Sequence, residues 1–345
     1  MPIMTCCPSC FVDVEIQAII KDLSQGNTGT CDCCSKKDVQ IVAIEDLLDY
    51  FIPLFNLYEE TNDSTADCLG TTIQKEWHIF TNDVIAQIIT QFLLTNHTNK
   101  SLKGVHVKKK FDGANDSDKI WQDFVDEIKC TNRFFINNNA IVRDIVSKLL
   151  QKHTKTLKAG TSLFRARICD NRNGFPNPAS DLGKPPHRKA SSGRANPQGI
   201  SYLYLANDPQ TTLFEVRASF LDYVSIGEFE LIKDITIVSL NDIHNISPFI
   251  EDINLQDYVT NKTILNHFRE ALSRPLRKTD SDLEYLPTQY LCEYIKSTLK
   301  AHGVEYASAM HAGGINYAFF DDQEFRFKNA KTVEVNKINM EYIDV

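Results

Sequence analysis

The sequence lacks an apolar run long enough to cross a membrane. The longest apolar stretches of the 345-residue chain, 84–94 and 41–58, are interrupted by polar or acidic side chains, whereas a membrane-spanning helix needs about 20 predominantly apolar residues. The start of the chain also lacks a basic segment followed by an apolar one, the pattern of a secretion signal. We therefore expect a cytoplasmic protein with no membrane partner.

An excess of positive charge is missing as well. The 37 Lys and Arg residues are outnumbered by 45 Asp and Glu residues, which gives a formal net charge of -8 at pH 7. A protein that grips nucleic acid through its overall field needs the opposite sign, so a nucleic-acid partner is not expected. Hydrophobic residues at 42% and charged residues at 24% are ordinary for a globular protein, and the length predicts more than one domain.

Cysteine, in contrast, is concentrated near the start of the chain. Two C-x-x-C pairs, Cys7 with Cys10 and Cys31 with Cys34, are separated by a short segment, and such pairs can wrap a tetrahedral zinc ion. The adjacent Cys6 and Cys33 are alternative ligands, although the spacing favours the first four. A disulfide staple would need an oxidising compartment, of which the sequence gives no sign. We predict a closed, structural zinc site in a module at 1–38, and core thiols at the four scattered cysteines, Cys68, Cys130, Cys169 and Cys292.

A helical pattern follows over 39–158. Apolar residues recur at spacings of three and four, which predicts amphipathic helices that pack as a bundle. Pro53 is expected to kink or split the first helix. The expected helices are Ala43–Tyr58, Ile73–Asn96, Ser117–Lys129 and Ala140–Thr154.

The stretch Gly193–Glu215 carries the strongest indication of chemistry. A loop of turn-forming residues precedes a buried strand at Ile200–Ala206, and Asp208 and Pro209 then suit the N-cap and first position of a short helix that carries Glu215. Arg194 and Glu215 bracket the strand, so together they could bind an anionic substrate and stabilise a developing cation. The alternative is a solvated loop arginine and a surface glutamate.

The segments on either side of this stretch predict further elements. Cys169–Ser192, with four prolines, is expected to be a long loop that is either a lid or a surface excursion. A basic cluster at Arg274, Arg277 and Lys278 is better explained as a solvated turn than as a phosphate site. The expected strands are Tyr223–Leu231 and Ile235–Leu240, and the expected helices are Leu255–Leu272 and Thr288–Lys300.

Four motifs in order resemble the RES domain, which is named for its Arg, Glu and Ser and occurs in bacterial toxins that consume NAD. They are LFRARI at 163–168, GRANPQG at 193–199, YLYLANDPQTTLFE at 202–215 and GVEYASAMHAGGINYAFF at 303–320. The resemblance implies a mixed α/β domain over 159–345 that is similar to ADP-ribosyltransferases, with a split, twisted sheet around the NAD site. The expected fold class is therefore α+β, with a zinc ribbon and helical bundle before this domain.

The helical region resembles the HEPN-like segment that accompanies some RES domains. Many HEPN proteins cleave RNA with an arginine and a histidine a few residues apart. Arg133 and Arg143 have no histidine in the turns that follow them, and His153 is too distant from either. RNA cleavage by this region is therefore not expected.

The resemblance also implies roles for individual residues. Arg165 and Arg194 would hold the pyrophosphate or the nearby ribose of NAD, and Arg167, two residues along the same strand face, could share this role. Tyr204 would stack on nicotinamide. Ser308 would hold the nicotinamide ribose, with Asn316 from the same motif as a further substrate ligand, and Glu215 would stabilise the oxocarbenium-like state. A Ser308 and His311 triad is not expected, because no third group would orient the histidine.

Three functions remain open from the sequence. The first is cleavage of the nicotinamide–ribose bond by a glycohydrolase or phosphorylase, which would make the protein a toxin or an antiphage effector held in check by an antitoxin or regulatory protein. The second is ADP-ribosylation of a target protein. The third is a catalytically silent RES-like half beside a zinc-helical adaptor for protein or nucleic acid. Ala195, where an aromatic residue often follows the arginine, departs from the family pattern, and a homo-oligomer is compatible with all three.

Overall fold

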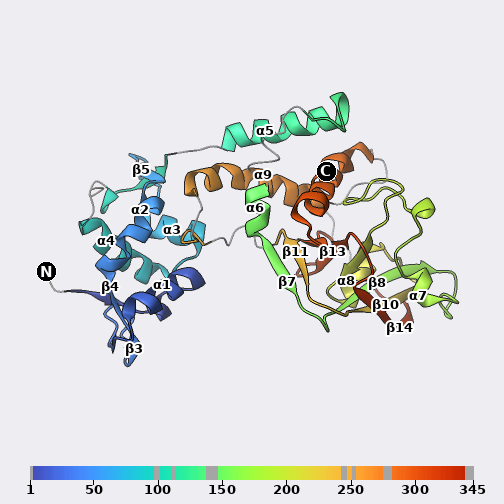
Figure 1. The fold of residues 1–345 in the computed structure, drawn as a ribbon, viewed down its shortest axis with the longest axis horizontal. Helices are drawn as coiled ribbons and strands as arrows, with labels where there is room; N and C mark the ends of the chain where they lie inside the picture. Colours follow the sequence, from blue (N-terminus) through green and yellow to red (C-terminus); the bar gives the residue numbers. More distant parts are fainter. Residues whose placement is uncertain are drawn as a thin grey trace. The chain divides into compact units, whose positions relative to one another are not determined.

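The computed structural model describes residues 3–96, 102–110, 114–136, 147–241, 247–250, 254–274 and 282–338 (Figure 1). The chain divides into two compact units, one formed by 1–117 with 244–263 and the other by 118–243 with 264–345. The divisions expected at 38/39 and 158/159 stay predictions. Among the described residues, no helix has the length and apolar character needed to span a membrane.

The first unit begins with the cysteine-rich segment. Strand β1 (Thr5–Cys6) pairs antiparallel with β4 (Val42–Ala43), and β2 (Thr28–Gly29) pairs with β3 (Val39–Gln40). Between them lie a 3-10 turn at Pro8–Cys10 and helix α1 (Val14–Ser24), which Asp13 caps by accepting hydrogen bonds from the backbone N–H groups of Glu15 and Ile16. These short ladders hold the two C-x-x-C segments side by side.

The rest of the first unit is helical with one more short ladder. Aromatic rings of its core pack against one another in tilted pairs, including Phe11 with Phe80 and Phe51 with Phe249. Its elements are α2 (Leu48–Phe55), α3 (Leu69–Trp77), α4 (Asp83–Asn96) and the strands β5 (Tyr58–Glu60) and β6 (Val107–Lys109).

Several expected helices differ from the observed ones. The helix predicted at Ile73–Asn96 is two helices, because His78 adopts a left-handed conformation that ends α3. Helix α2 continues through Pro53 rather than splitting there, and it starts only after a 3-10 turn at Ile44–Leu47. The helix expected at Ala140–Thr154 is described only from Ser147, where α6 (Ser147–Lys152) begins, because the described part of the chain does not include 140–146. Two members of the expected basic cluster, Arg277 and Lys278, also lie outside the described residues.

The second unit contains one mixed eight-stranded sheet. Its order is β14-β10-β8-β9-β13-β12-β11-β7, and among the described strands only β11 and β12 pair in parallel. The strands are β7 (Thr154–Leu157), β8 (Ser162–Cys169), β9 (Leu203–Ala206), β10 (Tyr223–Leu231), β11 (Ile235–Ser239), β12 (Gly303–Ala307), β13 (Ile315–Phe319) and β14 (Phe325–Glu334). The mixed sheet confirms the expected α+β class.

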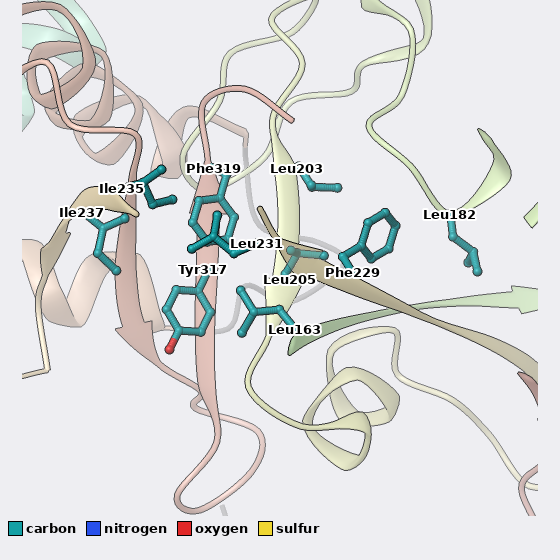
Figure 2. Packing of buried hydrophobic residues seen from close by; sticks show 10 residues of the cluster. All are labelled: Leu163, Leu182, Leu203, Leu205, Phe229, Leu231, Ile235, Ile237, Tyr317 and Phe319. Atoms are coloured by element: carbon teal, nitrogen blue, oxygen red, sulfur yellow. The ribbon is translucent and has the colours of Figure 1, made fainter. Parts of the chain in front are cut away.

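The sheet is almost divided in the middle. Strands β8 and β10 pair along eight positions, but β8 and β9 pair only through Phe164 and Ala206. The halves share a hydrophobic core in which Leu163 and Phe229 come from one half and Leu205, Tyr317 and Phe319 from the other (Figure 2). Side-chain packing therefore holds the two halves together where hydrogen bonds between β8 and β9 are nearly absent.

Five further helices lie wholly or partly in the second unit, and of these α7 and α8 contact strands of the sheet. They are α5 (Ala114–Asp126), the short α7 (Pro178–Asp181), α8 (Pro209–Glu215), α9 (Leu255–Ser273, in the second unit from Ile264) and α10 (Leu286–Tyr294). Helices α5 and α10 each continue into a π-helical turn, at Glu127–Thr131 and Ile295–Leu299. The expected elements at 223–231, 235–240 and 255–272 are confirmed within one residue. Strands β7 and β14 were not anticipated.

Candidate active site

A cavity of about 250 Å³ opens where β8 and β9 diverge. Phe164, Ala206, Asn316 and Tyr306 lie abreast on four neighbouring strands, and residues abreast on a sheet face the same side. Helix α8 contacts β8 and β9. The lining residues are Arg165, Ala166, Tyr204, Leu205, Ala206, Thr212, Glu215, Val216, Tyr306, Asn316 and Tyr317.

Glu215 is the carboxylate of this cavity. Helix α8 begins after Asp208, whose side chain accepts a hydrogen bond from the backbone N–H of Thr211, and Pro209 occupies its first position, as the sequence predicts. Two donors converge on Glu215 Oε1: Ser308 Oγ at 2.7 Å and Asn316 Nδ2 at 2.8 Å. Within the described residues no hydrogen bond reaches Oε2, so this oxygen can accept a bond from a ligand.

The Ser308 hydroxyl is committed to Glu215. Its single proton points to the carboxylate, while the oxygen accepts a hydrogen bond from the backbone N–H of Met310 at 3.2 Å. His311 instead bonds Thr211 Oγ1. Among the described residues no hydrogen bond joins Ser308 to a histidine, which a serine nucleophile requires. The reason differs from the expected one, because Thr211 does orient His311, but away from Ser308.

Arg165 supplies the positive charge of the cavity. One guanidinium N–H group donates to the carbonyl of Gly183 at 2.9 Å. Burial, together with the charge of Arg167, lowers the pKa of Arg165 to about 10. The side chain is still protonated at neutral pH, and because it is partly buried its charge acts on a ligand with less screening than in water.

Two uncharged tyrosine side chains, Tyr204 and Tyr306, line the cavity. Burial raises the pKa of both Tyr204 and Tyr306, so both phenols stay protonated at neutral pH. The Tyr204 hydroxyl donates to Asn196 Oδ1 at 2.7 Å and accepts from the backbone N–H of Ala195 at 3.2 Å. The loop before β9 thus fixes the ring that the sequence predicts as the stacking surface.

Arg194 makes a different set of contacts. Its guanidinium donates to the carbonyls of Leu272 and Ser273 at 3.4 and 3.2 Å, which are at the C-terminal end of α9. A cation at this end of a helix donates hydrogen bonds to carbonyls that have no partner within the helix. It also interacts favourably with the negative end of the helix dipole. Arg194 is not among the residues that line the cavity, and neither is Arg167.

The structure therefore brings four of the expected site residues to one cavity: Arg165, Tyr204, Glu215 and Asn316, with Ser308 bonded to Glu215. Sequence analysis missed Tyr306 and Thr212, which line it. It also missed Gln289 of α10, whose amide donates to Ser192 Oγ and to the carbonyls of Gly193 and Asn196. No local pattern indicates this residue, because its partners are more than 90 positions away.

A second cluster lies in the first unit. The sulfur atoms of Cys7, Cys10, Cys31 and Cys34 all lie within 4.8 Å of one another. The pairs Cys7–Cys34 and Cys10–Cys31 are each 3.5 Å apart, and Cys7–Cys10 is 3.9 Å apart. Zinc–sulfur bonds of about 2.3 Å in a tetrahedron place sulfur atoms about 3.8 Å apart, so the four thiols fit a zinc ion without rearrangement.

Comparison with known proteins bears on the second unit. No curated protein matches the sequence significantly. A solved structure, described as the crystal structure of the M. tuberculosis MbcT-MbcA toxin-antitoxin complex, matches 56% of this chain and 93% of its own, with 13% identity and a TM-score of 0.30; this likeness is too weak to carry an argument. The family model of the RES domain matches residues 162–341, more than half of the sequence, and the chain therefore belongs to the RES domain family.

Proposed function

We propose that this protein cleaves the nicotinamide–ribose bond of NAD. The observation that carries the proposal is the Glu215 carboxylate, which lines the cavity with both protein donors on Oε1. A carboxylate held in this way keeps Oε2 for a ribose hydroxyl and has its negative charge beside the ribose carbon. An oxocarbenium-like state needs this stabilisation as nicotinamide departs.

The other residues of the cavity complete the binding site. Tyr204 would stack on nicotinamide, while the partly buried charge of Arg165 would attract the pyrophosphate. Ser308 and Asn316 would hold Glu215 and, once NAD is bound, the nicotinamide ribose. The cavity is small for a ligand site, so we expect it to enclose the nicotinamide riboside end of NAD and leave the adenosine end outside.

The acceptor of the ribosyl cation decides the reaction class. Water would give ADP-ribose and phosphate would give its phosphorylated form, whereas a protein side chain would give an ADP-ribosylated target. We propose the first two, since loss of NAD then makes the protein a toxin or antiphage effector. In this proposal it acts in the cytoplasm and is silenced by an antitoxin.

The experiment is incubation of the purified protein with NAD, with and without inorganic phosphate, followed by chromatography of nicotinamide and the ribosyl product. Release of nicotinamide with free ADP-ribose or its phosphate supports the proposal. Nicotinamide release with label retained on protein supports ADP-ribosyl transfer instead. No release under any condition, with any bound inhibitor removed, would favour a silent RES domain.

We also propose that Cys7, Cys10, Cys31 and Cys34 bind one structural zinc ion. The support is their mutual spacing and the burial of three of them. Four thiolates leave no open coordination position, so the ion would organise the first unit rather than act on a substrate. The relation of this unit to HEPN proteins remains a prediction.

The close contacts of Gly193 predict that a larger residue at this position would displace the Tyr204 ring. A Cβ atom at Gly193 would lie 2.6 Å from Asn196 Oδ1 and 2.9 Å from the Tyr204 hydroxyl, so Gly193→Ala should separate this hydrogen-bonded pair. We expect kcat/KM for NAD to fall about tenfold, the worth of one buried hydrogen bond with some displacement. Steady-state kinetics of nicotinamide release would check it, with the exposed Ser191→Ala as control. An unchanged kcat/KM would show that Tyr204 placement does not matter.

Arg165 and Arg194 should respond differently to substitution. Arg165→Gln removes the charge in the cavity and should raise KM about tenfold or more with little change in melting temperature. Arg194→Gln removes the contacts with the end of α9 and should lower stability by about 1 kcal/mol, a few degrees in melting temperature. Kinetics and thermal unfolding of both variants would check the pair. A large rise in KM for Arg194→Gln would instead restore its expected role as a substrate ligand.

A further inference from the structure

A chain of three polar side chains joins the β12–β13 loop to the start of α8. His311 Nδ1 lies 2.8 Å from Thr211 Oγ1, which lies 2.5 Å from Asp208 Oδ2. The other carboxylate oxygen of Asp208 accepts a hydrogen bond from the backbone N–H of Thr211 at 3.0 Å. None of the three residues lines the cavity.

Counting protons fixes the direction of this chain. Burial of the Asp208 carboxyl raises its pKa, but the hydrogen bonds from Thr211 outweigh this effect and bring the pKa below its usual value. The carboxylate is therefore ionised at neutral pH and can only accept. The single hydroxyl proton of Thr211 goes to Asp208, so Thr211 Oγ1 must accept from His311, and Nδ1 must carry a proton.

The histidine ring has little freedom to move. It stacks on Phe214, with ring centroids 5.1 Å apart and an angle of 10° between the planes. A Cβ atom at Gly314 would lie 2.6 Å from Thr211 Oγ1 and 3.1 Å from His311 Nδ1. The loop can approach α8 this closely only because residue 314 is glycine.

The same loop and the same helix carry the site residues. Ser308 begins the loop, and its backbone N–H donates to Gly314, whose own N–H donates to the carbonyl of His311. At the far end of α8, Ser308 Oγ donates to Glu215. Fixing His311 on Thr211 therefore fixes where Ser308 meets the carboxylate.

We propose that His311 is a positioning residue for NAD cleavage, which holds the Ser308 loop against α8 by donating a hydrogen bond from Nδ1 to Thr211. This inference rests on the proposed function. His311 does not itself touch the reacting atoms. It acts through the placement of Ser308 on Glu215.

Kinetics of matched variants test this role. His311→Ala and Thr211→Val should each lower kcat about tenfold, the effect of one lost hydrogen bond on a site that must be well placed, with KM within about twofold. His311→Asn should recover most of kcat, because its amide N–H can replace Nδ1–H. The double variant should be no slower than either single one, and His302→Ala, an exposed histidine of the same unit, should match the wild type. Each variant must first show the wild-type circular dichroism spectrum.

A second measurement is independent of activity. Imidazole nitrogen NMR of ¹⁵N-histidine-labelled protein, with His311→Asn used to assign the resonance, should show Nδ1 of His311 protonated at neutral pH. A neutral ring with its proton on Nε2 would overturn the inference. So would a wild-type rate in His311→Ala, or no recovery in His311→Asn, while the proposed function survived. Failure of the wild type to release nicotinamide would overturn the proposed function itself, and with it this role.

Discussion

Replacement of Glu215 by Gln is expected to slow nicotinamide release by about a hundredfold or more. The change keeps the shape of the side chain and an oxygen for Ser308 and Asn316, but it removes the negative charge. The amide nitrogen that takes the place of Oε2 cannot accept a ribose hydroxyl. Removal of one preorganised electrostatic contact from a transition state typically costs a hundred- to a thousandfold in rate.

The measurement is kcat for nicotinamide release, together with NAD affinity by calorimetry. A loss confined to kcat would assign Glu215 to the transition state, whereas a loss confined to affinity would assign it to binding. Glu230→Gln is the matched control, since Glu230 belongs to β10 of the same unit and pairs with Arg326 rather than lining the cavity. A rate within threefold of wild type for Glu215→Gln would refute the mechanism.

Growth offers a second measure of the same substitution. If cleavage of NAD makes the protein toxic, cells should fail to tolerate expression of the wild type and should tolerate the Glu215→Gln form at equal abundance. Intracellular NAD should fall only with the wild type. Equal toxicity of the two forms would separate any toxicity from the Glu215 chemistry.

Loss of zinc is expected to unfold the cysteine-rich segment of the first unit. Its strands are two residues long, so hydrogen-bonded ladders alone cannot hold it. Binding of a structural zinc ion by small domains is worth about 10–16 kcal/mol near neutral pH. Cys31→Ser should therefore abolish zinc binding and remove the cooperative unfolding transition of this unit.

Metal analysis of the purified protein should give one zinc per chain for the wild type and none for Cys31→Ser. Cys33→Ser is the matched control: Cys33 lies in the same turn, but its sulfur contacts the carbonyl of Thr5 and it is not in the four-thiol cluster. Retention of zinc by Cys31→Ser, or its loss from Cys33→Ser, would assign the ligands differently. A metal-free wild type with two disulfides would contradict the zinc site altogether.

The features that could be predicted from sequence are those set by near neighbours. The start of α8 follows from Asp208 and Pro209, because a cap and a fixed φ angle act within one turn. The four zinc-spaced thiols follow from C-x-x-C turns in the same way. Strand β10 was predictable from its alternating pattern of apolar and polar residues.

Features set by distant partners could not be predicted. The Arg194 guanidinium meets the end of α9 nearly 80 residues later in the chain, and no local signal tells an anion ligand from a helix cap. Helix α3 ends because His78 adopts a left-handed conformation. Glycine or asparagine at this position would have indicated such an end, but histidine does not. Strand β14 alternates charged and apolar residues with partial burial, because it lies at the edge of the sheet.

The lone pairing of Phe164 with Ala206 has a consequence for the protein in the absence of a ligand. Beyond that pair, the facing edges of β8 and β9 do not hydrogen-bond to each other along the described strands, so the two halves are joined there mainly by side chains. A dinucleotide that contacted Arg165 on one half and Asn316 on the other would bridge the two halves of the sheet. The bound dinucleotide would then help to hold the two halves of the sheet together. Without it, the protein would separate most readily between β8 and β9, next to the cavity.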